Sequence, residues 1–194
     1  MTRSVAEAVG RTLAQLGVDH VFGVVGSGNF HVTNALVAAG ARFVAARHEN
    51  GAATMADAYA RVSGRVAAVS VHQGCGLTNA LTGITEAAKS RTPLVVLAAE
   101  VTAPRSNFYV DQPALAAAVG AVSERITSGA DAVAGTVRAY RRAVAERRTV
   151  LLNLPLPVQA EPADDMPVPA SAAPAVVSPD PDGVQRLAEL LARA

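Results

Sequence analysis

The sequence has little of several residue types that mark specialised classes of protein. It holds one cysteine and no tryptophan in 194 residues, and a single cysteine excludes the disulfide framework of a small secreted domain. Its formal net charge is only +1, so no strongly charged partner such as nucleic acid is implied. It also lacks a basic-then-apolar leader and an apolar run of about 18 residues, the length that spans a bilayer. We therefore expect a cytoplasmic protein that binds neither a membrane nor nucleic acid.

Small apolar residues are what the chain has in quantity. Hydrophobic residues make up 51% of the sequence, and alanine and valine rather than aromatic residues supply much of this share. Such a composition suits close packing between helices and a parallel sheet. The length fits one domain with a tail. The densest basic run, from Arg138 to Arg148, falls late in a predicted helix, where cations complement the helix dipole.

Segments typical of strands and of helices alternate over most of the chain. A capping box at Ser4 begins the first helix, which Gly17 ends. Short apolar runs predict strands, with helices between them, at residues 21–25, 42–46, 65–71, 93–98, 122–126 and 149–154. Strands that alternate with helices indicate right-handed βαβ units. We therefore predict an α/β fold, a three-layer αβα sandwich with a parallel sheet of about six strands.

The composition changes after the last predicted strand. Residues 160–182 contain six prolines among Ala, Asp and Ser, which is typical of an extended linker. Residues 183–194 then form a short amphipathic pattern with an apolar face at Val184, Leu187 and Leu191. We expect a domain over residues 1–159, a linker, and the truncated start of a following domain. The alternative is that the last helix packs back on the first domain.

Polar and glycine-rich segments follow three of the predicted strands. They are Gly26-Ser27-Gly28, His48-Glu49 and His72-Gln73-Gly74. Ligands of parallel α/β sheets bind at the carboxyl ends of the strands, so these loops predict one site at one edge. A Rossmann-type nucleotide-binding domain is one possible interpretation, because Gly26 and Gly28 follow a strand and Glu49 comes about 20 residues later. Its third glycine is missing, since His31 stands at that position.

The most specific pattern is the stretch from Arg47 to Arg61. It reads R-H-E-N-G-A-A-T-M-A-D-A-Y-A-R. It resembles the H-E-x-x-A-x-x-M-A-x-x-Y-A-R signature of thiamine-diphosphate-dependent enzymes in the acetolactate synthase, pyruvate oxidase and benzoylformate decarboxylase group. The chain is therefore similar to the aminopyrimidine-binding (PYR) domain of these enzymes.

The resemblance extends well beyond this stretch. Residues 21–27 are similar to the family's V-F-G-x-P-G-S loop, with Val25 in place of proline, and residues 74–79 to G-P-G-x-T-N, with Cys75 in place of proline. Further matches at residues 82–87 and 92–96 bring the similar region to about residues 3–160.

The resemblance implies a role for individual residues. Glu49 would hydrogen-bond the aminopyrimidine ring of thiamine diphosphate and share a proton with it, helped by burial, which favours a protonated carboxyl. His72 would be a second catalytic residue, because histidine exchanges protons near neutral pH. The residues that would contact the cofactor are Glu49, Gly26, Gly74, Asn79 and Thr82, and those that would contact the substrate are Ser27, His72, Gln73 and Gln112. The alternatives are a Glu49 that only begins a helix and a His72 that only satisfies backbone groups.

The family also uses parts that this sequence does not contain. The cofactor's diphosphate is bound there through Mg²⁺ on a second domain marked by a Gly-Asp-Gly motif, which does not occur in this chain. His20 and His31 have no partner at metal-ligand spacing, so we expect no metal site in the chain itself. We expect half of a site, inactive alone, in either a fragment or one subunit of a split enzyme, and FAD in the parent protein is left open.

The resemblance also implies partners and an activity. PYR domains of the family pair through the helices near Glu49, so a homo-oligomer, dimer or tetramer, is expected. The diphosphate-binding domain would be supplied in cis or by a partner subunit. The parent would be a 2-oxo acid decarboxylase or carboligase similar to acetolactate synthase, and its substrate is not determined by the sequence. A non-catalytic PYR domain retained for assembly or regulation is the remaining alternative.

Overall fold

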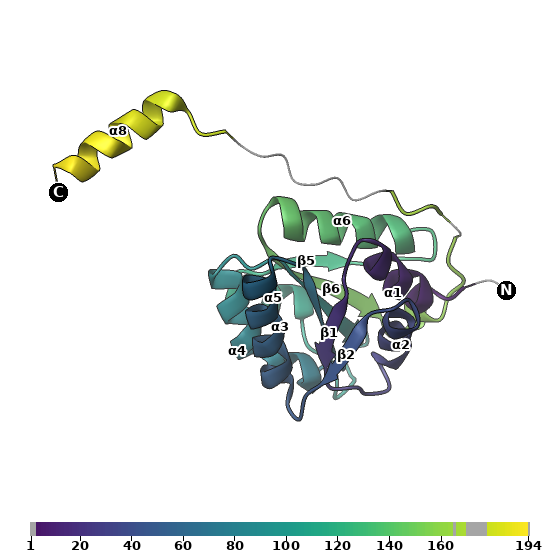
Figure 1. Cartoon of the computed structure of the whole chain (residues 1–194). Helices are drawn as coiled ribbons and strands as arrows, with labels where there is room; N and C mark the ends of the chain where they lie inside the picture. The colour runs from purple at the N-terminus through teal and green to yellow at the C-terminus, as the bar shows by residue number, and fades with distance from the viewer. Residues whose placement is uncertain (1–2, 165, 170–177, 194) are drawn as a thin grey trace.

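Six parallel strands form a single sheet. The computed structural model describes residues 3–164, 166–169 and 178–193. The strands are β1 (His20–Gly23), β2 (Arg42–Ala45), β3 (Ala67–Val71), β4 (Leu94–Glu100), β5 (Val122–Arg125) and β6 (Thr149–Pro155). Their order in the sheet is β2-β1-β3-β4-β6-β5, and every neighbouring pair is parallel (Figure 1). The predicted parallel sheet is confirmed.

Helices cover both faces of this sheet. The helices of the described residues are α1 (Val5–Gln15), α2 (Phe30–Ala38), α3 (Glu49–Ser63), α4 (Cys75–Lys89), α5 (Gln112–Val119), α6 (Ala132–Ala145), α7 (Leu156–Gln159) and α8 (Pro181–Ala192), and α8 is not among those that cover the sheet. The helices α1, α2 and α6 cover one face and α3, α4 and α5 the other (Figure 1). Side chains of each group share an apolar core with the sheet. The three-layer αβα sandwich is therefore confirmed. The short helix α7 was not predicted, because four residues are too few to show a period.

Burial on both faces explains why the central strands have continuously apolar sequences. All seven residues of β4 are buried. Val95 and Leu97 belong to the core under α1, α2 and α6, whereas Leu94 and Val96 belong to the opposite core. Successive side chains of a strand point to opposite faces, so a strand covered on both sides has no solvent-facing position.

The two helices α3 and α4 approach each other very closely. A Cβ atom at position 83 would lie 2.7 Å from the Cβ of Ala53 and 3.0 Å from the backbone nitrogen of Thr54. The backbone N–H of Gly83 donates to Asn50 Oδ1 at 2.9 Å. Only a residue without a side chain permits this contact, which brings the first turn of α3 against α4.

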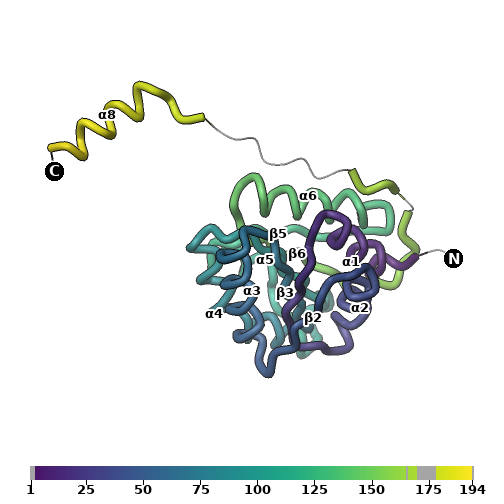
Figure 2. Tube along the Cα trace, viewed as in Figure 1, coloured from purple at the N-terminus to yellow at the C-terminus, as the bar shows by residue number. Residues whose placement is uncertain are grey.

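The first part of the expected linker packs on the domain. The backbone N–H of Val5 donates to the Glu161 carbonyl at 2.9 Å, and that of Ala163 donates to the Arg3 carbonyl at 2.8 Å. Ser4 and Pro162 form an antiparallel bridge, so residues 3–5 and 161–163 lie side by side (Figure 2). Ala163 is buried. The helix α8 has none of its residues buried.

Replacing Gly83 should test the contact between α3 and α4. We expect Gly83→Ala to lower the free energy of unfolding by about 1–3 kcal/mol, because its methyl group overlaps a tightly packed helix. Gly51→Ala in α3 is the matched control, since a Cβ there has no atom within 4 Å and alanine favours helix by up to about 1 kcal/mol. Urea unfolding of both variants measures the difference. Equal effects of the two substitutions would contradict the tight contact.

The stability of the domain should depend on the charge of Glu124. Its carboxylate accepts hydrogen bonds from Arg142 Nη1 at 2.7 Å and Arg138 Nε at 3.0 Å. Burial by itself would raise the pKa of Glu124, but the hydrogen bonds and charges of the two arginines outweigh it and lower the pKa below its ordinary 4.5. This contribution to stability is therefore present above about pH 4.5 and is lost as the pH falls through the lowered pKa.

Glu124→Gln should show this pH dependence directly. We expect it to lower the free energy of unfolding at neutral pH by about 1–2 kcal/mol, and the gap to the wild type should close in strong acid. Urea unfolding at several pH values measures it. Glu189→Gln, at an exposed position of α8, should change stability little at any pH. A gap that persists in acid would show that charge is not the cause.

Candidate functional site

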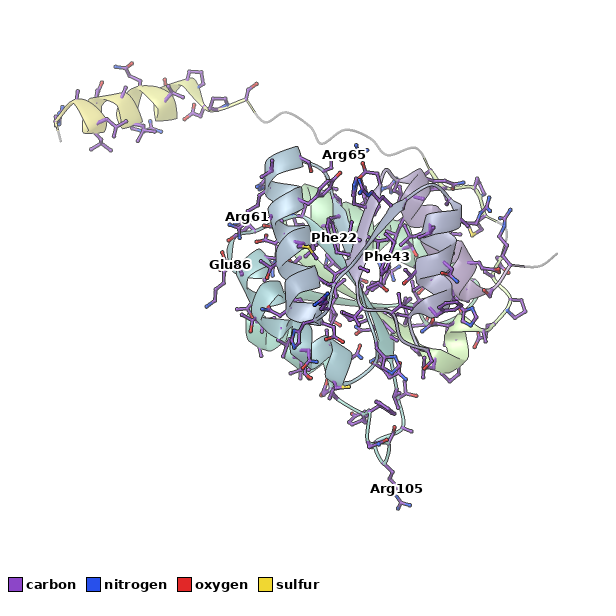
Figure 3. All side chains as sticks on the ribbon, turned by 60° about the horizontal axis from the view of Figure 1, so that its bottom comes forward. Phe22, Phe43, Arg61, Arg65, Glu86 and Arg105 are labelled. Atoms are coloured by element: carbon purple, nitrogen blue, oxygen red, sulfur yellow. The ribbon has the colours of Figure 1, made fainter. Side chains whose placement is uncertain are left out.

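The loops after β1, β2, β3 and β4 gather at the carboxyl edge of the sheet. Because the strands are parallel, the three loops predicted to form a site lie at this one edge. The loop after β4, residues 101–111, joins them and extends away from the domain, with Arg105 at its tip (Figure 3). The edge is thus built by four loops, of which three were predicted.

Glu49 is the first residue of α3 and faces α4. The backbone N–H of Asn50 donates to His48 Nδ1 at 3.2 Å, which caps the helix and fixes where it begins. Asn79 Nδ2 of α4 donates to Glu49 Oε2 at 3.2 Å. A Cβ atom at position 76 would lie 3.5 Å from Glu49 Oε1. Glu49 is partly exposed in this chain rather than buried, so the chain by itself does not enclose the carboxyl group.

His72 follows β3 and, like Glu49, lies next to Gly76. A Cβ atom at position 76 would lie 3.0 Å from the His72 Cβ, so Gly76 has both residues as close neighbours. The backbone N–H of Gly28 donates to His72 Nδ1 at 3.2 Å, which leaves the proton of the neutral ring on Nε2. Phe108 packs edge-on against the imidazole with ring centroids 5.7 Å apart.

In the turn after β1, neighbouring side chains leave no room for a Cβ atom at the two glycines. A Cβ atom at Gly26 would lie 2.8 Å from His72 Nδ1, and one at Gly28 would overlap Gln73 Oε1. In a dinucleotide-binding turn the corresponding space receives the pyrophosphate. Here the turn's space is filled by His72 and Gln73. These contacts therefore remove the basis of the Rossmann interpretation.

The other predicted site residues occupy different environments. Ser27 and Thr82 are exposed, whereas Gln73 and Gln112 are buried. Gln112 Nε2 donates to the Ala99 carbonyl at 2.8 Å and so fixes the start of α5. Gly74 adopts a left-handed conformation with φ of 63°, and a Cβ there would lie 2.5 Å from the Phe108 carbonyl oxygen. Gly74 is therefore needed to seat the loop after β4.

Two residues at this edge were not singled out by the sequence. Phe108 contacts His72 and the turn at Gly74. Asn29 is only 1% exposed and holds the turn after β1 through its side-chain amide. Neither belongs to a motif. An asparagine directly after a glycine turn is ordinarily a solvated loop residue, so only its burial marks it.

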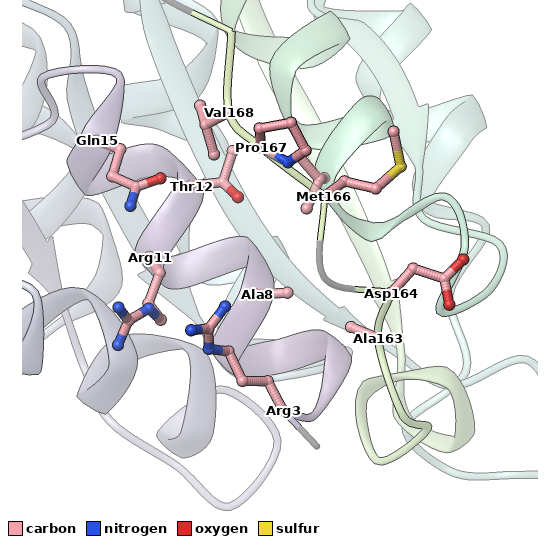
Figure 4. Close-up of a pocket in the computed structure, with 11 residues that line it drawn as sticks. Arg3, Ala8, Arg11, Thr12, Gln15, Ala163, Asp164, Met166, Pro167 and Val168 are labelled. Carbon is pink, nitrogen blue, oxygen red and sulfur yellow. The ribbon is translucent and has the colours of Figure 1, made fainter. Parts of the chain in front are cut away.

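A groove of the described chain lies away from this edge of the sheet. It has a volume of about 840 Å³ and is formed by α1 together with residues near Ala163 and Met166 (Figure 4). None of the predicted site residues lines it. Across the described ranges, no group of three or more His, Cys, Asp or Glu side chains is arranged to hold a metal ion. None of the helices in the described part of the chain has the length and apolar character of a membrane span.

The comparisons with known proteins identify the family. Residues 3–125 match the family model described as thiamine pyrophosphate enzyme, N-terminal TPP binding domain. The chain belongs to this family. The resemblance recognised in the sequence is thereby confirmed, and with it thiamine diphosphate as the family's ligand. The description of the family places such domains in thiamine pyrophosphate enzymes.

Several curated relatives contain a similar TPP-binding domain. The Pseudomonas aeruginosa protein named probable 2-ketoarginine decarboxylase AruI is 35% identical over 202 residues, which cover 100% of this chain and 36% of that protein. The sulfoacetaldehyde acetyltransferase of Rhodobacter capsulatus is 29% identical over 100% of the chain and 33% of its own length. The acetolactate synthase isozyme 3 large subunit of Escherichia coli is 44% identical over 50% of the chain and 17% of its length. This chain spans about a third of the length of the first two of these relatives.

A solved structure shows the same fold. It comes from Mycobacterium smegmatis and is described as a candidate thiamin diphosphate-dependent enzyme. The two structures superpose with a TM-score of 0.83, and their sequences are 23% identical. The match covers 98% of this chain and 38% of the other.

The contact between Gly28 and Gln73 should be measurable as an energetic coupling. We expect Gly28→Ala to lower the free energy of unfolding by about 1–3 kcal/mol, because its methyl group overlaps the buried Gln73 amide. Gln73→Ala in the same chain should recover part of this loss, with a coupling of at least about 0.5 kcal/mol. Urea unfolding of the wild type, the two single variants and the double variant gives the coupling energy. Strictly additive effects would show that the two residues do not contact.

Proposed function

We propose that the chain is the PYR half of the active site of a thiamine-diphosphate-dependent 2-oxo acid decarboxylase or carboligase similar to acetolactate synthase. The observation that carries this proposal is the placement of Glu49 and His72 close to the same residue, Gly76, at the carboxyl edge of the sheet. Membership of the TPP-binding family supports it. In this proposal Glu49 activates the cofactor and His72 exchanges protons with the substrate.

The residues around Glu49 fit the aminopyrimidine end of thiamine diphosphate. Asn79 holds Oε2, which leaves Oε1 to form a hydrogen bond with a ring nitrogen. Gly76 adds no side chain beside Oε1, so a flat ring can approach it. When bound, thiamine diphosphate supplies the electron sink for loss of carbon dioxide from a 2-oxo acid. Glu49 would share its proton with the ring nitrogen, and His72 would use the proton on Nε2.

We propose that this half-site is inactive alone. Glu49 is partly exposed, whereas a carboxyl group that is to keep a proton near neutral pH needs burial. The cover would come from a domain that binds the diphosphate through Mg²⁺, in the same polypeptide or on a partner subunit. This chain spans only about a third of the length of two relatives, which supports such a larger protein. A requirement for FAD would be a property of that larger protein.

We propose that the partner surface is formed by α3 and α4. Next to Glu49 these helices expose an uncharged stripe of residues that contains Gly51, Met55, Ala58, Val62, Cys75, Thr78 and Thr82. Val62 is 89% exposed and Met55 37%. Exposed apolar side chains such as Val62 and Met55 favour contact with another protein. A second copy pairing here would give a homodimer or tetramer and would shield Glu49 from water.

Glu49→Gln should abolish the proposed activity without unfolding the protein. The measurement requires the natural polypeptide that contains these residues, together with any subunit that binds Mg²⁺. We expect the rate of decarboxylation of 2-oxo acids to fall by about 10²- to 10⁴-fold, because the amide cannot exchange a proton with the ring. Glu86→Gln on α4 is the matched control, since Glu86 is exposed and pairs with Arg61.

The two variants separate the proposal from its alternative. Loss of activity only in Glu49→Gln supports the assigned role. Unchanged activity in Glu49→Gln would overturn the mechanism. A wild-type protein that assembles but decarboxylates no 2-oxo acid would favour the non-catalytic role in assembly or regulation.

A further inference from the structure

Asn29 holds the turn after β1 with every polar atom of its amide. Its Oδ1 accepts from the Gly26 N–H at 2.8 Å, and its Nδ2 donates to the Val24 carbonyl at 3.2 Å and to Ser70 Oγ at 2.9 Å. The Val24 carbonyl can only accept and the Gly26 N–H can only donate, so the orientation of the amide is determined. Asn29 is 1% exposed, which makes each of these bonds costly to lose.

A closed ring of hydrogen bonds fixes Asn29 to β3. Thr33 Oγ1 donates to the Asn29 carbonyl at 2.7 Å and lies 2.7 Å from Ser70 Oγ. Since the Thr33 hydroxyl has a single proton, Ser70 must be the donor to Thr33. The ring runs from Asn29 Nδ2 to Ser70, from Ser70 to Thr33, and back to the Asn29 carbonyl. Each hydroxyl therefore donates once and accepts once, which leaves the network fully satisfied.

The position of this network connects it to His72. Ser70 lies on β3 two residues before His72, and Gly28 directly precedes Asn29. With the turn held at Gly26 and Asn29, the N–H of Gly28 between them points at His72 Nδ1 and lies 3.2 Å from it. A histidine nitrogen that accepts a hydrogen bond cannot carry the ring's proton. The turn therefore selects which nitrogen of His72 is protonated.

We propose that Asn29 is a positioning residue for His72. It holds the Gly28 N–H against Nδ1 and so keeps the proton of the neutral imidazole on Nε2, the nitrogen that remains free for a ligand. This inference rests on the proposed function only for the use made of that proton. The hydrogen bond itself is a property of this chain without any cofactor.

The experiment measures the hydrogen bond between Gly28 and His72 directly. In the ¹⁵N-labelled 194-residue chain, a scalar coupling between the Gly28 amide nitrogen and His72 Nδ1 is expected, and it must vanish in His72→Gln. In Asn29→Ala we expect the coupling to disappear and the Gly28 amide proton to exchange with solvent about five- to tenfold faster, as the loss of one hydrogen bond predicts.

Asn153→Ala is the matched control. Asn153 is also fully buried and lies within β6, where its Nδ2 donates to Ser123 Oγ at 2.8 Å and to the Glu124 carbonyl at 2.8 Å. Asn153→Ala should lower the free energy of unfolding about as much as Asn29→Ala does, and it should leave the coupling between Gly28 and His72 intact. A loss of the coupling in this control would mean that general destabilisation is the cause, which would overturn the proposal.

The remaining outcomes also decide the proposal. A wild-type His72 with its proton on Nδ1, or no coupling to Gly28, would overturn it, and so would a coupling that survives Asn29→Ala. If Asn29→Ala does not fold, Ser70→Ala removes one anchor of the amide and should weaken the same coupling; an unchanged coupling there would count against the proposal. A failure of Glu49→Gln to affect catalysis leaves this result untouched, which distinguishes the two.

Discussion

The close approach of α3 to α4 is the contact on which the geometry of the candidate site depends. Gly83 lets the backbones meet, and its N–H is bonded to the side chain of Asn50, next to Glu49. With α3 seated in this way, Asn79 of α4 reaches the Glu49 carboxylate. The candidate carboxyl group is thus positioned by two packed helices rather than by a loop, which restricts its motion.

In the turn after β1, at the same edge of the sheet, glycines leave room for side chains of the neighbouring loop. At Gly26 and Gly28 the missing Cβ atoms leave room for His72 and Gln73. A turn rich in glycine is the usual mark of a phosphate-binding loop, yet the same composition here serves contact between two turns of the protein.

Much of the fold could be predicted from the sequence, and the exceptions have a common cause. The strands β4 and β6 are buried on both faces, so their apolar runs identify them without any partner. Residues 160–182 read as linker because they contain six prolines. Backbone groups of residues 161–163 nevertheless pair with residues 3–5, which are far away in the sequence. No local sequence pattern predicts a pairing over that separation.

The sequence by itself determined the alternation of strands and helices, the edge at which the site lies, and the identity of Glu49 and His72 as candidates. Those conclusions depend on periodicity and on motif residues, which are local properties of the chain. Only the tertiary structure decided that Asn79 bonds Glu49, that Gly28 bonds His72, and that Asn29 is buried. Each of these depends on atoms far apart in sequence meeting within hydrogen-bond distance, and side-chain direction and burial exist only after the helices have packed on the sheet.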